Sequence, residues 1–442
     1  MTDITIARTD DAGIARGARA LVVVPDLGAG GRRSGEARLE EAVGLSAAIS
    51  LDIVGAEVVR VRSPRPATLF GTGQVEVLAA TVAGHEAELV VVDGNVSPIQ
   101  QRNLEKALGA KVIDRTGLIL EIFGERAATR EGTLQVELAH LDYQASRLVR
   151  SWTHLERQRG GFGFLGGPGE TQIETDRRLI RDRMAKLRRE LEGVKRTRTL
   201  HRSRRQRAPW PVVALVGYTN AGKSTLFNRL TGSDVMAEDL LFATLDPTLR
   251  AIRLPGHDKV MLSDTVGFVS DLPTQLVAAF RATLEEVLSA DLIIHVRDIS
   301  HADSDAQAAD VEEVLGTLGV RSGGPDAVPM IEAWNKLDRV DEDRRAALVA
   351  EADRRDDVVA QSALTGEGLE RLITAVADRL TAAARVHRIQ LSSSDGEGLA
   401  WLRAHGTVVR EEASEDGTTR SVDVRLSDVD RRRFEARLAV RT

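Results

Sequence analysis

One short segment near the middle of the 442-residue chain constrains the fold more than any other. The apolar run Val212–Val216 is followed by the loop Gly217-Tyr-Thr-Asn-Ala-Gly-Lys-Ser224 and then by an amphipathic helical pattern. This is a phosphate loop in its required strand–loop–helix setting, since its glycines let successive backbone N–H groups point at phosphate oxygens. We expect Lys223 to reach the β- and γ-phosphates and Ser224 to offer its hydroxyl to Mg²⁺. The segment predicts an α/β fold with a nucleotide at the carboxyl edge of a parallel sheet.

Two motifs downstream of the phosphate loop are suited to magnesium and the γ-phosphate. Phe242-Ala-Thr-Leu-Asp246 contains Thr244, which can reach Mg²⁺ only when a γ-phosphate is present. Asp264-Thr-Val-Gly267 follows a predicted strand and offers a carboxylate that can hold Mg²⁺ through water, together with a glycine N–H that can sense the γ-phosphate. The pair predicts a segment that changes conformation with the nucleotide state.

Two more motifs predict which base is bound. Asn335-Lys-Leu-Asp338 ends a predicted strand, and the acceptor-only carboxylate of Asp338 matches the N1–H and N2–H₂ donors of guanine, whereas adenine has no donor at N1. Ser362-Ala-Leu364 is a backbone clip for the base carbonyl. The sequence therefore predicts a guanine nucleotide. The candidate nucleotide-binding residues are Gly217, Tyr218, Thr219, Asn220, Ala221, Gly222, Lys223, Ser224, Thr225, Phe242, Ala243, Thr244, Leu245, Asp246, Asp264, Thr265, Val266, Gly267, Asn335, Lys336, Leu337, Asp338, Ser362, Ala363 and Leu364.

The candidate catalytic residues are Lys223, Thr244, Asp264, Gly267 and Phe268, and the candidate Mg²⁺ ligands are Ser224, Thr244 and, through water, Asp264. In Ras-like enzymes a glutamine after the Asp-x-x-Gly motif orients the attacking water, and Phe268 stands at that position here. A phenyl ring cannot orient water, so we expect slow intrinsic hydrolysis that a partner accelerates; the alternative is that Phe268 only packs. Asn220 resembles the residue that coordinates an activating K⁺ ion in some related GTPases.

The rest of the chain divides around this domain. Residues 1–18 lack periodicity and are expected to be a mobile tail, and 19–131 alternate apolar runs (Leu21–Val24, Ala56–Val61, Glu88–Val92, Lys111–Ile113) with helical patterns around 36–50, 73–84 and 97–108. This alternation predicts an N-terminal parallel α/β domain with helical crossovers. A P-loop GTPase domain is expected over 209–385, and 387–442 reads as a small C-terminal α+β domain.

Two heptad patterns occupy residues 132–207. Leu134, Leu138, Leu141, Ala145, Leu148, Trp152 and Leu155 form the first, and Ile173, Ile180, Met184, Leu187, Leu191 and Val194 the second. The glycine-rich stretch 160–169 separates them, so the pattern predicts an antiparallel helical hairpin with an exposed tip. A merely structural connection between such helices is usually about 2 to 8 residues long and rarely so rich in glycine.

Charge is distributed unevenly along the chain. The formal net charge is −6, but residues 177–207 hold 14 Arg or Lys and 3 Asp or Glu, a local charge of +11 that leaves −17 for the remainder. An excess of one sign without alternating i, i+4 pairs favours contact with a polyanion over a solvated helix face. The absence of cysteine excludes disulfides, thiolate zinc sites and cysteine nucleophiles. No apolar run approaches the roughly 18 residues that span a bilayer, so a cytoplasmic protein is expected.

The chain resembles the HflX family of ribosome-associated GTPases over almost its whole length. The resemblance rests on Gly71-Thr-Gly-Gln-Val-Glu, Ser97-Pro-Ile-Gln-Gln-Arg-Asn-Leu-Glu-Lys-Ala-Leu, Val112-Ile-Asp-Arg-Thr-Gly-Leu-Ile-Leu, Arg130-Glu-Gly-Thr-Leu-Gln-Val-Glu-Leu-Ala, Gly167-Pro-Gly-Glu-Thr-Gln-Ile-Glu-Thr-Asp-Arg-Arg178 and Phe242-Ala-Thr-Leu-Asp-Pro-Thr248. It implies a GTPase that binds the large (50S) ribosomal subunit and splits or rescues stalled ribosomes under stress. Phe268 is itself typical of such GTPases.

In that picture the N-terminal domain and the hairpin contact ribosomal RNA. The candidate RNA contacts are Arg157, Arg159, Gly160, Gly161, Gly166, Gly167, Arg177, Arg178 and Arg181. Family members often have arginine just before the Gly-Pro-Gly-Glu sequence, where this chain has Gly166, which predicts a weaker RNA contact at the tip. Some members also use ATP, which the Asp338 argument disfavours.

Two other interpretations of the sequence stay open. One is a GTPase in ribosome assembly or RNA modification without splitting activity. The other is an RNA-binding scaffold whose conformation is tuned by nucleotide. The expected partners are GTP or GDP and the large ribosomal subunit with its RNA. The expected cofactors are Mg²⁺ and K⁺, and the expected oligomeric state is a monomer.

Overall fold

A computed structural model describes residues 16–28, 33–158, 175, 177–194, 210–232, 241–242, 248–270, 287–320, 328–382, 385–414, 417–426 and 428–439. The chain forms two compact units. The first comprises 1–192, 238–246 and 269–282, and the second comprises 193–237, 247–268 and 283–442. Two short segments that lie beyond residue 192 in the sequence therefore belong to the first unit.

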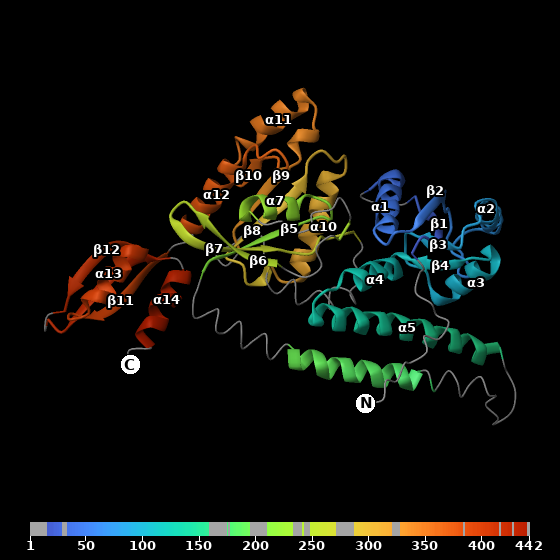
Figure 1. Cartoon of the computed structure of the whole chain (residues 1–442), viewed down its shortest axis with the longest axis horizontal. Helices are drawn as coiled ribbons and strands as arrows, with labels where there is room; N and C mark the ends of the chain where they lie inside the picture. The colour runs from blue at the N-terminus through green and yellow to red at the C-terminus, as the bar shows by residue number, and fades with distance from the viewer. Residues whose placement is uncertain are drawn as a thin grey trace. The chain divides into compact units, whose positions relative to one another are not determined.

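The first unit contains a four-stranded parallel sheet in the order β2-β1-β3-β4, coloured blue to teal in Figure 1. The strands are β1 (Arg19–Asp26), β2 (Asp52–Arg60), β3 (Leu89–Val92) and β4 (Lys111–Asp114). The crossover helices are α1 (Gly35–Ala47), α2 (Thr72–Gly84) and α3 (Pro98–Leu108). The predicted parallel α/β domain is confirmed, because continuous apolar strands such as Leu89–Val92 are buried on both faces.

A helix that the sequence analysis did not identify follows β4. In α4 (Arg115–Arg126), the side chain of Asp114 caps the first turn by accepting the N–H of Gly117 at 2.9 Å. Leu118, Ile119, Leu120, Ile122 and Phe123 are buried. The sequence analysis assigned a strand to Lys111–Ile113 and no element to the residues after it.

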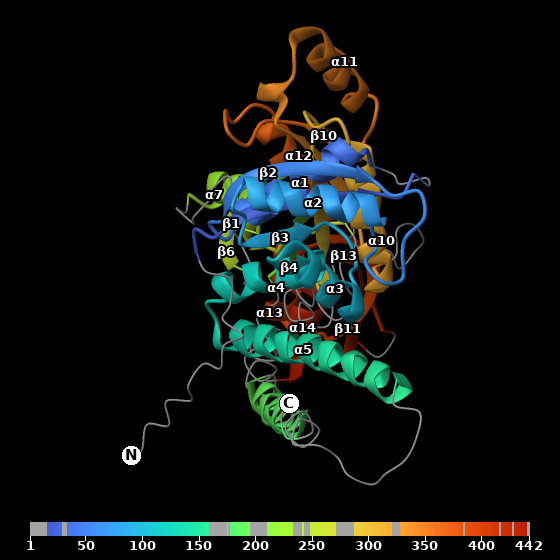
Figure 2. The same ribbon diagram turned by 90° about the vertical axis from the view of Figure 1, so that its right-hand side faces the viewer.

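Two long helices follow in the first unit and lie side by side in Figures 1 and 2. They are α5 (Arg130–Gln158) and the helical residues 177–194. Met184, Leu187 and Leu191 are buried at the predicted spacing, and Arg183 donates to Glu137 across the pair at 2.6 Å. The predicted tip, 160–169, lies outside the described residues.

The second unit contains a six-stranded sheet in the order β10-β9-β8-β5-β7-β6. The strands are β5 (Val212–Gly217), β6 (Thr248–Leu254), β7 (His257–Asp264), β8 (Leu292–Asp298), β9 (Met330–Asn335) and β10 (Val358–Ala360). All pairings are parallel except that of β6 with β7. Its helices are α7 (Lys223–Thr231), α10 (Ser304–Thr317), α11 (Glu342–Ala352) and α12 (Leu369–Ala382). The phosphate loop therefore leaves a central strand, with neighbouring strand ends on both sides.

The C-terminal part of the second unit has its own apolar core, which includes Leu402, Val424 and Phe434. Its antiparallel sheet has the order β11-β13-β12, formed by β11 (Arg385–Ser392), β12 (Thr407–Ala413) and β13 (Thr419–Leu426). Two helices complete it, α13 (Gly396–His405) and α14 (Asp428–Ala439). The small C-terminal α+β domain expected from the sequence is confirmed.

Candidate functional site

The phosphate loop turns back on itself between β5 and α7. Gly222 has a φ of 93°, and a Cβ there would stand 2.2 Å from the side-chain nitrogen of Asn335, so the position requires glycine. Lys223 is buried, and its Nζ donates to the carbonyls of Gly217 at 3.1 Å and Tyr218 at 2.7 Å. Burial lowers the pKa of Lys223 to about 8, while Asp264 favours the charged form. Backbone carbonyl groups of the loop thus fix the position of the Lys223 ammonium group.

A hydroxyl and a carboxylate meet beside the loop. Ser224 opens α7, Asp264 ends β7, and the Ser224 Oγ donates to the Asp264 Oδ2 at 2.8 Å. The parallel register that pairs Leu215 with Asp264 places the carboxylate there. Mg²⁺ prefers oxygen ligands of these two kinds, so the residues fit that ion. The third candidate ligand, Thr244, lies outside the described residues.

The segment after Asp264 is joined to the loop by its backbone. The N–H of Thr219 donates to the carbonyl of Phe268 at 2.7 Å, and the N–H of Phe268 donates to the carbonyl of Gly217 at 3.1 Å. A Cβ on Gly267 would stand 2.8 Å from the Cα of Thr219 and 3.2 Å from the Nζ of Lys223, so no side chain fits. The ring of Phe268 is buried, as the packing interpretation expects.

Asn335 connects the phosphate loop to the loop after β10. It is buried, its Nδ2 donates to the carbonyl of Ala221 at 2.8 Å, and its Oδ1 accepts the N–H of Ala363 at 2.9 Å. The hydroxyl of Ser362 donates to Asp338, and the same hydroxyl accepts the N–H of Thr365. Four of the five predicted motifs therefore lie together at the carboxyl edge of one sheet.

Two residues at this edge escaped the sequence analysis. Asp298, at the end of β8, pairs with the Nζ of Lys336 at 2.8 Å, and Arg229, on α7, donates to the carbonyl of Leu364 at 2.8 Å. A polar residue directly after an apolar strand was the available signal for Asp298. Nothing local to Arg229 indicates its partner, since the two residues are far apart in sequence.

The chain is similar in sequence to known GTPases, in agreement with the nucleotide-site geometry. Family models match in succession, described as GTP-binding GTPase N-terminal (36–124), GTP-binding GTPase middle region (126–205), 50S ribosome-binding GTPase (212–336) and HflX C-terminal domain (347–442). The GTPase HflX of Magnetococcus marinus is 52% identical over 386 residues, covering 87% of this chain and 88% of that protein. The chain belongs to the HflX family of GTPases. It is an enzyme that hydrolyses GTP.

Other HflX relatives match as broadly. The GTPase HflX of Escherichia coli is 44% identical over 373 residues, covering 84% of this chain and 86% of that protein. The crystal structure of SsGBP in complex with GDP is 25% identical with a TM-score of 0.46, covering 82% of this chain and 98% of that one.

Within the part of this HflX chain that the structure describes, no helix is both long and apolar enough to cross a membrane.

The remaining candidate residues of this HflX GTPase are placed as follows. Phe242 is buried in the first unit, and Asn220 is exposed with a φ of 59°. The hydroxyl of Thr265 donates to the carbonyl of Leu215 at 2.6 Å. Outside the described residues lie Ala243, Thr244, Leu245, Asp246, Arg159, Gly160, Gly161, Gly166 and Gly167, together with the side chain of Arg157.

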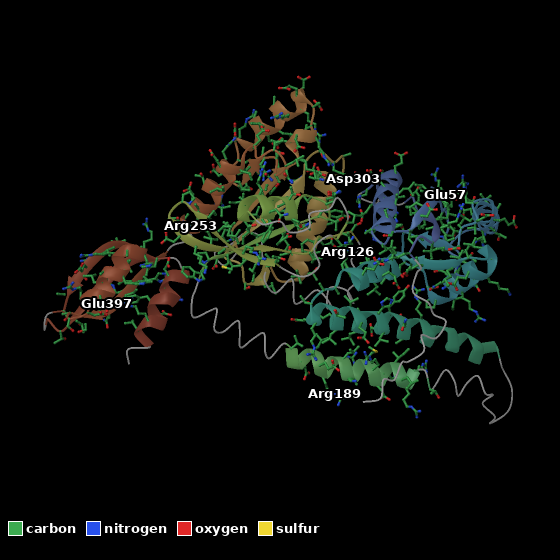
Figure 3. All side chains as sticks on the ribbon, viewed as in Figure 1. Glu57, Arg126, Arg189, Arg253, Asp303 and Glu397 are labelled. Carbon is green, nitrogen blue, oxygen red and sulfur yellow. The ribbon has the colours of Figure 1, made fainter. Side chains whose placement is uncertain are left out.

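The HflX helix 177–194 carries exposed arginines beside its buried apolar stripe. Arg178, Arg181, Arg188 and Arg189 are exposed, whereas Met184, Leu187 and Leu191 are buried; Figure 3 labels Arg189 on this helix. The Nε of Arg189 donates to the carbonyl of Ala185 within the helix. The part of the basic run within 177–194 thus places exposed arginines on a packed helix.

One buried histidine in the second unit predicts acid sensitivity. Burial lowers the pKa of His295 on β8 to about 4, against the attraction of Glu332. His295 is neutral in the folded protein, while the unfolded chain binds a proton below a pH of about 6.5. The stability that neutral His295 contributes is therefore fully present above that pH, and it is lost as the pH falls toward 4. Because of this residue, we expect the free energy of unfolding of the wild type to be about 2 kcal/mol lower at pH 5 than at pH 7.

The measurement is urea unfolding of the nucleotide-free protein at pH 7 and pH 5. His295→Leu should remove this part of the pH dependence. The exposed residue His85 provides the control, and His85→Gln should keep the wild-type pH dependence. An equal loss of stability in the wild type and His295→Leu would contradict the assignment.

Proposed function

We propose that this HflX GTPase uses its GTP cycle to control binding to the large ribosomal subunit, and that it splits or rescues stalled ribosomes under stress. The observation that carries the proposal is the basic face of residues 177–194, present in the same chain as a guanine nucleotide site. One HflX segment, 212–336, also matches the family model described as 50S ribosome-binding GTPase. A charge excess of one sign is the electrostatic footprint of an RNA-binding surface.

In this proposal each motif has a separate role at the nucleotide. The loop N–H groups and Lys223 bind the phosphates, Gly267 senses the γ-phosphate, and Asp338 accepts hydrogen bonds from guanine. Ser224, Thr244 and, through water, Asp264 would hold Mg²⁺, which would supply positive charge beside the phosphates. The Ser224–Asp264 contact at 2.8 Å supports this ligand pair. Asn220 is the proposed site of K⁺.

Phe268 leaves the attacking water without an orienting side chain. Its ring is buried and its backbone groups bond to Gly217 and Thr219. We therefore propose slow hydrolysis by the free protein and acceleration by the ribosome, with RNA contacts at Arg177, Arg178 and Arg181 and along the segment from Arg157 to Gly167. The protein would act as a cytoplasmic monomer. A GTPase of ribosome assembly or RNA modification is the second candidate, which the same basic face accommodates.

The first test is the GTPase rate with and without purified large ribosomal subunits. Acceleration of at least about tenfold is expected, because stabilising charge supplied in trans commonly accelerates such sites by more than that. The separate question of splitting is answered by sedimentation of intact ribosomes with the protein and GTP, where free subunits should increase. An unchanged rate would exclude ribosome activation, and unchanged sedimentation despite activation would favour the assembly candidate.

The second test removes charge from the helix. Replacing Arg178, Arg181, Arg188 and Arg189 by glutamine should weaken affinity for large subunits and reduce the salt slope of log K by about 1 for each phosphate that is no longer neutralised. A matched control replaces four exposed arginines of the second unit, Arg354, Arg371, Arg403 and Arg410. Equal effects of the two quadruple variants would mean that net charge, and not this helix face, governs binding.

A further inference from the structure

The carboxyl edge of the first unit's sheet holds a cluster of buried ionic side chains. In the order β2-β1-β3-β4, the chain leaves β1 toward β2 and leaves β3 toward β4, so the strand order reverses between β1 and β3. A crevice at such a point is where open α/β sheets bind ligands. Asp93 follows β3 directly, and Arg115 begins α4 directly after β4. The cluster thus stands where a ligand is expected.

Arg115 is the centre of this cluster. Its Nη1 contacts the Oδ1 of Asp93 at 2.5 Å and its Nη2 contacts the Oε1 of Glu41 at 2.5 Å. Glu41 also pairs with Arg33, and Asp93 with Arg38 at 3.0 Å. Burial opposes ionisation of Glu41, yet Arg115 and Arg33 hold its pKa below the usual value. Burying this many charges is costly unless they are paired, and here they are paired.

The cluster binds a segment that comes from far along the chain. The Nη2 of Arg115 donates to the carbonyl of Ser270 at 3.1 Å and to its hydroxyl at 3.2 Å, and Arg33 donates to the same hydroxyl at 3.4 Å. Ser270 belongs to the first unit, although it follows Phe268 of the second unit by two residues. The group that this cluster binds is therefore part of the chain itself.

A second contact in the first unit involves the segment before Thr244. The rings of Phe242 and Phe123 meet edge to face, with centroids 4.7 Å apart. Leu241 packs so closely on Gly44 that a Cβ on the glycine would stand 3.1 Å from its Cδ1. Phe242 has a φ of 59°, a conformation that costs a bulky residue energy and persists only when surrounding contacts fix it. The first unit thus holds residues next to both nucleotide-sensing motifs.

We infer that Arg115 is a positioning residue for GTP hydrolysis, acting through Ser270 on the segment that contains Gly267 and Phe268. One end of that segment is fixed to the phosphate loop by the two backbone hydrogen bonds of Phe268. Arg115 fixes the other end by binding Ser270. The contact of Arg115 with Ser270 thus restrains the chain two residues after Phe268, close in sequence to Gly267. The inference rests on the proposed role of Gly267.

The experiment compares Arg115→Lys and Ser270→Ala in the full-length protein without ribosomes. Lysine keeps a positive charge between Glu41 and Asp93 but lacks the forked donors that reach Ser270, and alanine removes only the hydroxyl. Arg147→Lys is the matched control, because Arg147 pairs with Asp114 at 2.6 Å near the same sheet edge. GDP affinity, GTPγS affinity and the single-turnover GTPase rate are measured for each protein.

In Arg115→Lys the single-turnover rate should fall about tenfold, since small misplacements at a reacting centre are costly. The affinity for GTPγS relative to GDP should fall in both variants, with Ser270→Ala the milder, while GDP affinity stays within about twofold of the wild type. Arg147→Lys should match the wild type. A wild-type rate and affinity ratio in both variants, a faster rate, or equal losses of GDP and GTPγS affinity would overturn the inference. Failure of the wild type to bind GDP would instead refute the proposed nucleotide site.

Discussion

Two backbone hydrogen bonds hold the nucleotide site together, the one from Thr219 to Phe268 and the one from Phe268 to Gly217. They join the phosphate loop to a segment about fifty residues further along the chain. The parallel register of β5 and β7 places Asp264 beside Leu215 and brings its carboxylate to Ser224. Gly267 must lack a side chain because the backbone of Thr219 is so close. The phosphate loop, the Ser224–Asp264 pair and Gly267 are consequently held together by hydrogen bonds and close backbone contact.

Polar side chains gather at the carboxyl ends of the parallel strands in both of the larger sheets. In the second unit the edge carries the nucleotide motifs, which are joined by hydrogen bonds. The side chain of Asn335, for example, bonds to the carbonyl of Ala221 and the N–H of Ala363. In the first unit the edge carries a paired ionic cluster whose partner is Ser270. Ser270 follows Phe268 by two residues, so the chain leaves the second unit and enters the first within the few residues after Asp264. Short-range chain connectivity is what gives Arg115 its inferred influence on hydrolysis.

Much of this architecture could be predicted from the sequence, because it depends on local patterns. Apolar runs such as Leu21–Val24 became β1, and the heptad positions Met184, Leu187 and Leu191 became a buried stripe. The features that escaped prediction depend on distant partners. Strand β6 forms by antiparallel pairing with β7. Arg229 donates a hydrogen bond to the carbonyl of Leu364, and Ser270 accepts one from Arg115. No short window of sequence contains both members of such a pair.

The central claim is that the edge formed by Asp338 and its neighbours selects guanine. The most direct measurement is the affinity of the wild type and of Asp338→Asn for GDP, ADP and xanthosine diphosphate. The wild type should prefer GDP over ADP by more than about a hundredfold, because ADP leaves the carboxylate of Asp338 without the donors of guanine. In Asp338→Asn the preference should pass to xanthosine diphosphate, whose O2 accepts from the new amide. Equal binding of GDP and ADP by the wild type, or full retention of GDP by the variant, would contradict the account.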